Sequence, residues 1–168
     1  LVWNGDYSAT DLSRHGLTAY NKHPLFRTVS IDRSFYRPLT VAQFAQHAAQ
    51  VNDDFRFVVK APSLVTDALQ RDDSGRGTRQ NAHFLDAQEA LQLFVEPAVE
   101  GLGHKLGALV FQISPLPTQW FAHMPKLIER LHRMLATIPD LKKIAPDSVV
   151  AVEVRDPQWL TAQFVDVL

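Results

Sequence analysis

The sequence predicts an α/β fold, namely a parallel β/α (TIM-type) barrel that is incomplete in this chain. Short apolar runs alternate with longer amphipathic stretches, and this alternation is typical of a parallel sheet with crossover helices. Each apolar run also has one side that turns polar near its carboxyl end. Because a doubly wound sheet carries helices on both faces and is apolar on both, the polar side favours the barrel.

Apolar periodicity predicts the individual elements. Thr40 and Gln43 match a capping box at the start of a helix predicted over residues 40–51. Pro97 should kink or restart a second helix, predicted over residues 83–101. Asp156 and Pro157 resemble the N-cap and the first residue of the last predicted helix. Strands are expected at residues 28–32, 55–60, 106–113 and 149–155, and helices at 40–51, 83–101, 119–136 and from Trp159 onward.

Alternation within each strand indicates where a site should lie. Successive side chains of a strand point to opposite faces, so Ser30 and Asp32 share the polar face of the first strand. Barrel enzymes build their active sites at the carboxyl ends of the strands and in the loops that follow. The polar residues at or near such ends are Asp32, Lys60, Gln112, Glu153 and Arg155. Residues 71–80 (RDDSGRGTRQ) are expected to be a flexible loop.

Composition excludes several kinds of function. The 168 residues suit one domain, and a net charge of -1 gives no global attraction to nucleic acid, which makes nucleic-acid binding an unfavoured interpretation. The absence of cysteine removes disulfides, thiolate catalysis and thiolate-bound metals. No apolar run is long enough to span a bilayer, so we expect no membrane partner and a cytoplasmic protein.

Four longer segments occur in a characteristic order and spacing: TVSIDRSFYRP, DDFRFVVKAPSLVT, KLGALVFQISP and VAVEVRDPQWL. Through them the chain resembles the YecE-like family, also called domain of unknown function 72, over roughly residues 25–162. The resemblance implies a β/α barrel longer than this chain, with an additional first strand and further C-terminal strands. It implies no established reaction. We therefore expect residues 1–168 to be a single barrel domain that lacks its first strand and its C-terminal strands.

The chain departs from the family pattern at two places. The first family segment resembles T-V-E-I-N, with a carboxylate where this chain has Ser30 and an amide where it has Asp32. If that glutamate matters for the family's chemistry, this chain has altered or lost it. Family members also often have Thr-His where this chain has Thr66 and Asp67. The remaining polar strand residues match their segments.

Three residues are the candidate catalytic groups: Glu153, Lys60 and Asp32. Glu153, at the end of an apolar strand, is the best candidate for a general acid or base; its structural alternative is to neutralise Lys60 or Arg155. Lys60 could bind an anion or act as a base or nucleophile, or it could form a structural ion pair. Asp32 could be a catalytic carboxylate or a partner of Arg33 or Arg37.

Three further residues are candidate substrate-binding groups: Arg155, Gln112 and Tyr36. Arg155 offers a planar fork for a carboxylate or phosphate, or it could only clamp the loop that follows it. Gln112 could orient a hydroxyl or carbonyl group, or complete an internal hydrogen-bond network. Tyr36 could stack on a sugar or a base, although an aromatic residue after a strand is more often part of the core.

No metal site and no cofactor are implied by the sequence. The seven histidines form no pattern at metal-ligand spacing, and no glycine motif for nucleotide phosphates is present. The leading hypothesis is an enzyme of unknown reaction that acts on a small polar or anionic molecule by acid–base chemistry. The alternative is a non-catalytic ligand-binding or regulatory module, and nucleic-acid processing ranks below both.

Overall fold

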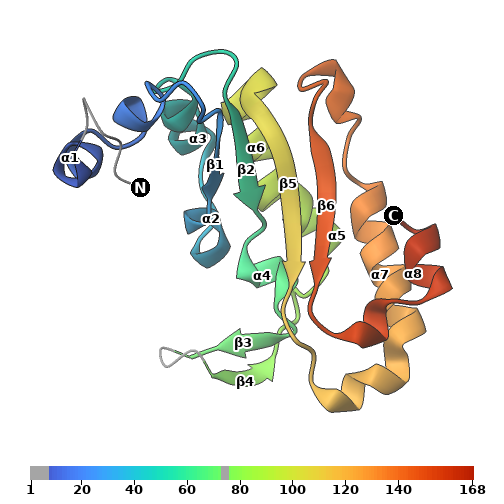
Figure 1. Ribbon diagram of the computed structural model, residues 1–168. Coiled ribbons are helices and arrows are strands. Elements are labelled where there is room, and N and C mark those ends of the chain that lie inside the picture. Colours follow the sequence, from blue (N-terminus) through green and yellow to red (C-terminus); the bar gives the residue numbers. More distant parts are fainter. Residues whose placement is uncertain (1–7, 73–75) are drawn as a thin grey trace.

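The centre of the molecule is a four-stranded parallel sheet, seen in the computed structural model, which describes residues 8–72 and 76–168 (Figure 1). Neighbouring strands follow the order β1-β2-β5-β6 and are all parallel. The four strands therefore end at the same edge of the sheet, and each predicted strand is confirmed to within one residue at its ends. Their bounds are Thr28–Ile31 for β1, Arg56–Lys60 for β2, Leu106–Ile113 for β5 and Val149–Val154 for β6.

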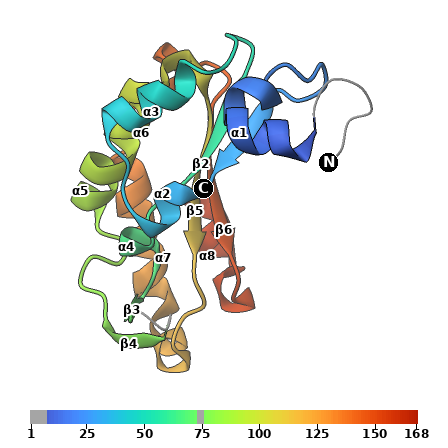
Figure 2. The same cartoon turned by 90° about the vertical axis from the view of Figure 1, so that its left-hand side faces the viewer.

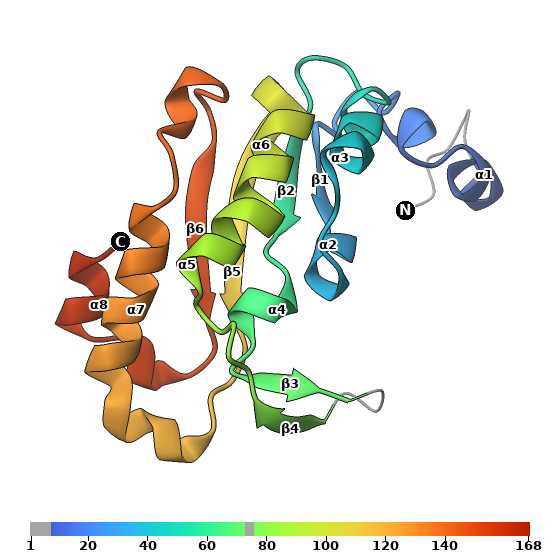
Figure 3. The ribbon, with the colours of Figure 1, turned by 180° about the vertical axis from the view of Figure 1, so that it is seen from behind.

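Helices cover one face of this sheet and leave the other face bare (Figure 2). Seen from behind, α3, α5 and α6 lie across the covered face, and α7 stands beside them near β6 (Figure 3). In Figure 1 no helix stands in front of β2, β5 or β6. The described part of the chain is thus an open two-layer α/β fold, and its strands close no barrel. The covering helices are α3 (Val41–Ala48), α5 (Ala87–Ala90), α6 (Glu96–Leu102) and α7 (Met124–Ala136).

The core lies between the covered face and these helices. Alternate strand residues such as Phe57, Leu109 and Phe111 are fully buried there. Phe94 meets Phe111 edge-to-face, with ring centroids 5.4 Å apart, a favourable arrangement for aromatic pairs. The residues between them point to the bare face and are partly exposed. The strands therefore have the predicted buried apolar side and a second side that turns polar only near the carboxyl end, as Val58 and Val110 precede Lys60 and Gln112 on it.

Helix α3 begins where the sequence predicts. The hydroxyl oxygen of Thr40 accepts a hydrogen bond from the backbone N–H of Gln43, and the Gln43 side chain accepts one from the Thr40 N–H at 2.9 Å. This capping box satisfies two backbone donors that a helix start would otherwise leave unpaired. Helix α3 packs closely on α6 at Gly101, where an added Cβ atom would lie 2.5 Å from the Cβ atom of Phe44.

Two predicted helices are less regular than expected. The stretch 83–101 becomes α5, a π-helical turn over Leu91–Val95 and then α6, with Pro97 at the restart, as predicted. The stretch 119–136 opens with a 3-10 turn over Thr118–His123, and α7 begins only at Met124. Pro125 accounts for this start, because proline lacks the N–H that a preceding helical turn would need but fits the first turn of a new helix.

The predicted last helix also begins later than expected. Pro157–Trp159 forms only a 3-10 turn, because the carboxylate of Asp156 accepts a hydrogen bond from the Leu116 N–H at 2.7 Å instead of capping a helix. Helix α8 (Ala162–Asp166) begins after Thr161, whose hydroxyl oxygen caps it. Asp156 and Pro157 are therefore the N-cap and the first residue of a 3-10 turn, and the prediction of a helix that continues from Trp159 onward is wrong.

The prediction of a flexible loop over 71–80 is also wrong where the structure describes it. Strand β3 (Leu69–Arg71) pairs antiparallel with β4 (Gly77–Gln80), and this hairpin projects beyond the carboxyl edge of the sheet (Figure 1). Residues 73–75 lie outside the described residues. The short α4 (Ser63–Thr66) leads from β2 to the hairpin, the short α2 (Arg33–Tyr36) follows β1, and α1 (Ala9–Tyr20), which the sequence did not predict, precedes it.

Candidate functional site

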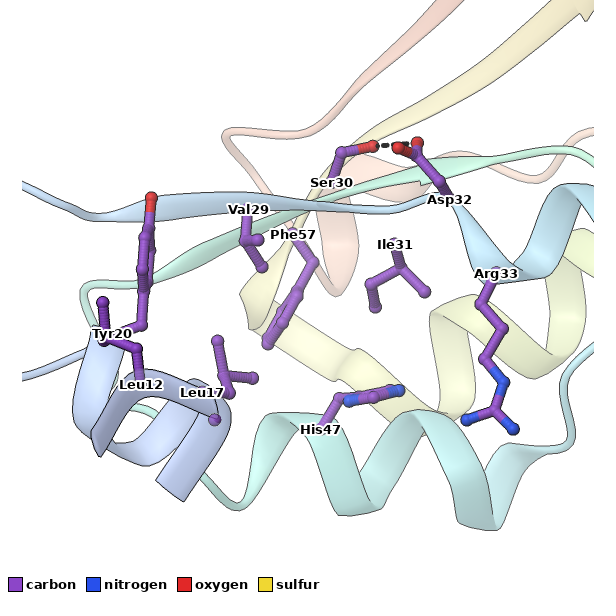
Figure 4. A pocket seen from close by; sticks show the side chains of 11 residues that line it. Leu12, Leu17, Tyr20, Val29, Ser30, Ile31, Asp32, Arg33, His47 and Phe57 are labelled. Carbon is purple, nitrogen blue, oxygen red and sulfur yellow. Dashed lines mark hydrogen bonds between the residues drawn. The ribbon is translucent and has the colours of Figure 1, made fainter. Parts of the chain in front are cut away.

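One ion pair lies at the carboxyl ends of β1 and β2. The ammonium nitrogen of Lys60 is 3.5 Å from a carboxylate oxygen of Asp32. The same oxygen accepts a hydrogen bond from the hydroxyl group of Ser30 at 2.7 Å. Ser30 and Asp32 project from one side of β1, whereas Val29 and Ile31 project from the other (Figure 4). The strand alternation thus places this pair on the bare face of the sheet.

A second ion pair lies at the carboxyl end of β6. A guanidinium nitrogen of Arg155 donates a hydrogen bond to the Glu153 carboxylate at 3.1 Å. Gln112 lies beside Glu153 on the neighbouring strand, because the two residues are register partners of β5 and β6. The predicted candidates Gln112, Glu153 and Arg155 therefore form one group on this face of the sheet.

The two ion pairs lie on the same face of the sheet but are separate. Lys60 is the register partner of Val110 on β5. Gln112 and its partner Glu153 lie two residues further toward the carboxyl edge. With strands ~4.8 Å apart and a rise of ~3.3 Å per residue, the Cα atoms of Lys60 and Glu153 are about 12 Å apart. Long side chains can cross part of that gap, so a small molecule between the pairs could contact both.

The pairs contribute little to stability. The side chains of Lys60 and Asp32 are 30% and 62% exposed, and those of Arg155 and Glu153 are 53% and 43% exposed. Ion pairs this accessible to water contribute about 0–1 kcal/mol. They can therefore exchange their partner for a ligand at small cost, which buried structural pairs cannot do.

Tyr36 lies apart from the other five candidates. Its side chain is 82% exposed, so Tyr36 is not part of the core that the described residues form. It lines a cavity of about 440 Å³ that is bounded by α2, α4 and the hairpin, and none of the other five candidates lines that cavity. The structure therefore brings Asp32 to Lys60, and Gln112 to Glu153 and Arg155, but places Tyr36 on a neighbouring wall.

Sequence reasoning missed a buried polar cluster at the same edge of the sheet. The Asp67 carboxylate is 4% exposed and accepts a hydrogen bond from Arg71 at 2.5 Å and another from the Ser114 hydroxyl group. The amide of Asn81 donates to the Asp67 carbonyl oxygen at 2.8 Å. This cluster joins the residues after β2, the end of β5 and the hairpin. One feature of the sequence could have pointed to this cluster: Asp67 stands where family members often have the histidine of a Thr-His pair.

Ser34 is a second residue that sequence reasoning missed. It is buried, and its hydroxyl group lies 2.6 Å from the Lys60 carbonyl oxygen and 2.7 Å from that of Ile31. One hydroxyl hydrogen can serve either acceptor. The contact fixes the start of α2 against the ends of β1 and β2, and it thereby positions the backbone that carries Lys60.

An apolar cavity of about 510 Å³ opens on the other side of β1, between α1 and α3 (Figure 4). Leu17, Ile31 and Phe57 line it, with His47 on the α3 side. Burial lowers the pKa of His47, and the positive charge of Arg33 lowers it further. His47 therefore favours the neutral form in the folded protein.

Residues 8–72 and 76–168 contain neither a metal-binding cluster nor a membrane-spanning helix. No three histidine, aspartate or glutamate side chains in these ranges gather into a group that could hold a metal ion. Within the same ranges, no helix has both the length and the apolar character needed to cross a membrane.

The comparisons with known proteins agree on one family. The family model described as "Protein of unknown function DUF72" matches residues 2–168. No curated protein sequence matches the chain at a significant level.

Solved structures give the same result at the level of fold. A crystal structure of a DUF72 family protein from Enterococcus faecalis V583 is 21% identical with a TM-score of 0.52, and the match covers 92% of this chain and 53% of that one. A DUF72 family protein from Thermotoga maritima MSB8 is 23% identical with a TM-score of 0.52, and the match covers 85% of this chain and 46% of that one. The chain thus spans about half the length of the solved structures that it matches.

Proposed function

The chain belongs to the DUF72 family of proteins of unknown function, and from this membership we propose that it is part of a parallel β/α barrel enzyme. The enzyme binds a small polar or anionic molecule at the carboxyl ends of its strands and acts on it by acid–base chemistry. The carrying observation is that two half-exposed ion pairs, Asp32–Lys60 and Glu153–Arg155, share one uncovered face at that edge.

The bare polar face supports the barrel. In a barrel the helices cover only the outside, and polar groups can line the inside at the mouth. Neither edge strand of the described sheet, β1 or β6, has a further strand beside it. Stable proteins usually cover such edge strands or pair them with another strand. Along β6 an open cavity of about 850 Å³ is lined by Val150 and Val152 on one side and by Leu135 of α7 on the other. Further strands and helices would bury these surfaces.

Each charged group has a defined role in the proposed reaction. Glu153 and Asp32 are the proton-transferring groups, since carboxylates can act as general acids and bases when they lie within reach of the reacting atom. Lys60 and Arg155 hold the anionic group of the substrate, with Arg155 able to form two parallel hydrogen bonds. Gln112, beside Glu153, orients a hydroxyl or carbonyl group.

A non-catalytic ligand-binding module is the second candidate function. The observation that favours it is that Asp32 and Glu153 both already form ion pairs. Each carboxylate already has a cationic neighbour, and a serine occupies the position of the family's glutamate. The hydroxyl group of that residue, Ser30, donates to Asp32 and cannot replace a carboxylate as a base at neutral pH. Such a module would bind the same kind of molecule without changing it.

The test is an incubation of the protein with a library of phosphorylated and carboxylated sugars and small metabolites, followed by mass spectrometry. The enzyme hypothesis predicts that one compound is consumed and that Glu153→Gln lowers the rate by about 10²–10⁴-fold. Glu100→Gln is the matched control, because Glu100 is exposed on α6, away from the bare face. A compound that raises the melting temperature without being consumed favours the binding module. Absence of both binding and consumption contradicts the proposal.

A further inference from the structure

The cavity beside Tyr36 has the features of a separate binding subsite. It lies at the carboxyl edge of the sheet, between the end of α2 and the hairpin, and measures about 440 Å³. Small-molecule sites typically measure about 300–1,000 Å³. Its walls directly follow two candidate residues, since α2 comes after Asp32 and Pro62 comes shortly after Lys60.

The floor of this cavity is held rigidly by the buried Asp67 cluster. Asp67 binds Arg71 of the hairpin at 2.5 Å. The Asn81 amide donates to the Leu64 carbonyl oxygen at 2.6 Å and to the Asp67 carbonyl oxygen at 2.8 Å, so it ties α4 to the hairpin. Because a buried carboxylate with several donors is costly to displace, the hairpin is fixed at this end. A ligand would therefore meet a preformed wall.

The opposite wall carries an exposed aromatic ring and a cation. Tyr36 is 82% exposed and rests edge-on against Phe35, with ring centroids 5.5 Å apart. Arg37 follows it and also lines the cavity, and it forms no ion pair with any residue of the described ranges. Among the described residues that line the cavity, Arg71 binds Asp67, which leaves the guanidinium group of Arg37 as the cation of the opposite wall.

We propose that this cavity binds a planar ring with an anionic substituent, the ring against Tyr36 and the phosphate or carboxylate at Arg37. Aromatic rings offer a face for stacking, and an arginine fork matches the oxygens of either anion. The inference rests on the proposed function, since the subsite would hold one end of the molecule whose other end lies between the two ion pairs. It narrows the substrate class to ring-bearing acids or phosphate esters.

The experiment measures binding of phenyl phosphate, benzoate and methyl phosphate to the protein by ligand-observed NMR. Phenyl phosphate and benzoate distinguish the two anions, and methyl phosphate removes the ring. The subsite predicts that Arg37→Gln weakens binding of the preferred ring anion by about tenfold or more. Tyr36→Leu should bring the affinity for the preferred ring anion close to the affinity for methyl phosphate, which has no ring. The control is Arg133→Gln, because Arg133 is exposed on α7 and should not affect binding.

The outcomes separate this subsite from the proposed function. Lys60→Gln should leave binding of phenyl phosphate and benzoate nearly unchanged, because Lys60 does not line this cavity. If Lys60→Gln abolishes binding of the ring anions while Arg37→Gln has no effect, the subsite is overturned and the site between the ion pairs remains. Equal binding by the Arg37→Gln and Arg133→Gln variants, or no saturable binding of any ring anion by the unaltered protein, also overturns it. Melting curves of each variant establish that it is folded.

Discussion

Ser34 donates a hydrogen bond to the backbone carbonyl oxygen of Lys60 at 2.6 Å. The contact joins the start of α2 to the end of β2, and Ser34 is 1% exposed. A buried hydroxyl group at this point holds together the two strand ends that carry the Asp32–Lys60 pair. The candidate site therefore depends on a residue that bears no charge and makes no contact with the bare face.

Removing the hydroxyl group of Ser34 should lower the free energy of unfolding of the protein. Ser34→Ala removes the donor that the carbonyl oxygens of Ile31 and Lys60 share, and loss of such a donor costs about 1–3 kcal/mol of unfolding free energy. Chemical denaturation measures this loss. Ser13→Ala, at an exposed position of α1, should change the unfolding free energy by less than about 0.5 kcal/mol. A Ser34→Ala variant as stable as the control would show that the bond does not stabilise the strand ends.

The Asp67–Arg71 contact should couple the hairpin to the sheet. Asp67→Asn keeps the shape of the side chain but loses the charge, and we expect a loss of about 1–3 kcal/mol. Arg71 is 47% exposed, so its charge can regain water and the loss should stay below that of a fully buried pair. A double-mutant cycle with Arg71→Gln measures the coupling. Strictly additive effects would contradict the contact.

Close packing at Gly101 should make that position intolerant of a side chain. In Gly101→Ala the new Cβ atom would meet the Phe44 Cβ atom at 2.5 Å and the Val41 carbonyl oxygen at 2.6 Å. Overpacking of this kind costs about 1–3 kcal/mol and should exceed the gain in helix propensity, which is at most about 1 kcal/mol. Thermal unfolding should show a lower melting temperature. An unchanged or raised melting temperature would mean that α3 and α6 can move apart freely.

The lowered pKa of His47 predicts a pH-dependent loss of stability. Its unfolded pKa is close to the ordinary 6.5, and its folded pKa lies lower because of burial and, secondarily, Arg33. The unfolded state therefore binds more protons below pH 6.5, so stability falls as pH drops through that value and levels off below the folded pKa. Asp11 and Asp53 also have lowered pKa values, but their effect begins only near pH 3.8.

His47→Gln tests this assignment. Unfolding free energies measured from pH 7.5 to pH 5 should vary less with pH in His47→Gln than in the unaltered protein. His132→Gln is the control, since His132 is exposed on α7 and should leave the pH profile unchanged. Identical slopes for the unaltered protein and His47→Gln would assign the pH dependence to other groups.

The sequence was sufficient for much of the fold and for one face of the site. Strand alternation correctly separated Asp32 and Ser30 from Val29 and Ile31, because the period of two is a geometric property of any strand. The helix start at Thr40 was equally predictable, since a capping box involves only neighbouring residues. The family was also identified correctly from its four segments.

The rest depended on contacts between distant residues. Asp156 has the local sequence of a helix cap, yet it binds the Leu116 N–H across the chain. Strands β3 and β4 carry mostly polar and glycine residues, so no alternation marks them, and the contacts that tie them to the rest of the fold are made by Asp67 and Asn81. Likewise, Tyr36 could not be separated from the other candidates until the direction of α2 was known.

The central claim is that the bare face between the two ion pairs binds a small anionic molecule. The most direct measurement is a backbone amide NMR titration with the library compound that most raises the melting temperature. We expect the amide signals of residues 30–32, 60, 112 and 153–155 to shift together, and the shifts to weaken in Lys60→Gln but not in Lys126→Gln, an exposed position on α7. Residues 30–32 also line the cavity beside β1, so the signals of residues 60, 112 and 153–155 are the decisive ones. Shifts confined to the cavities at the β1 or β6 edges, with those signals unchanged, would contradict the claim.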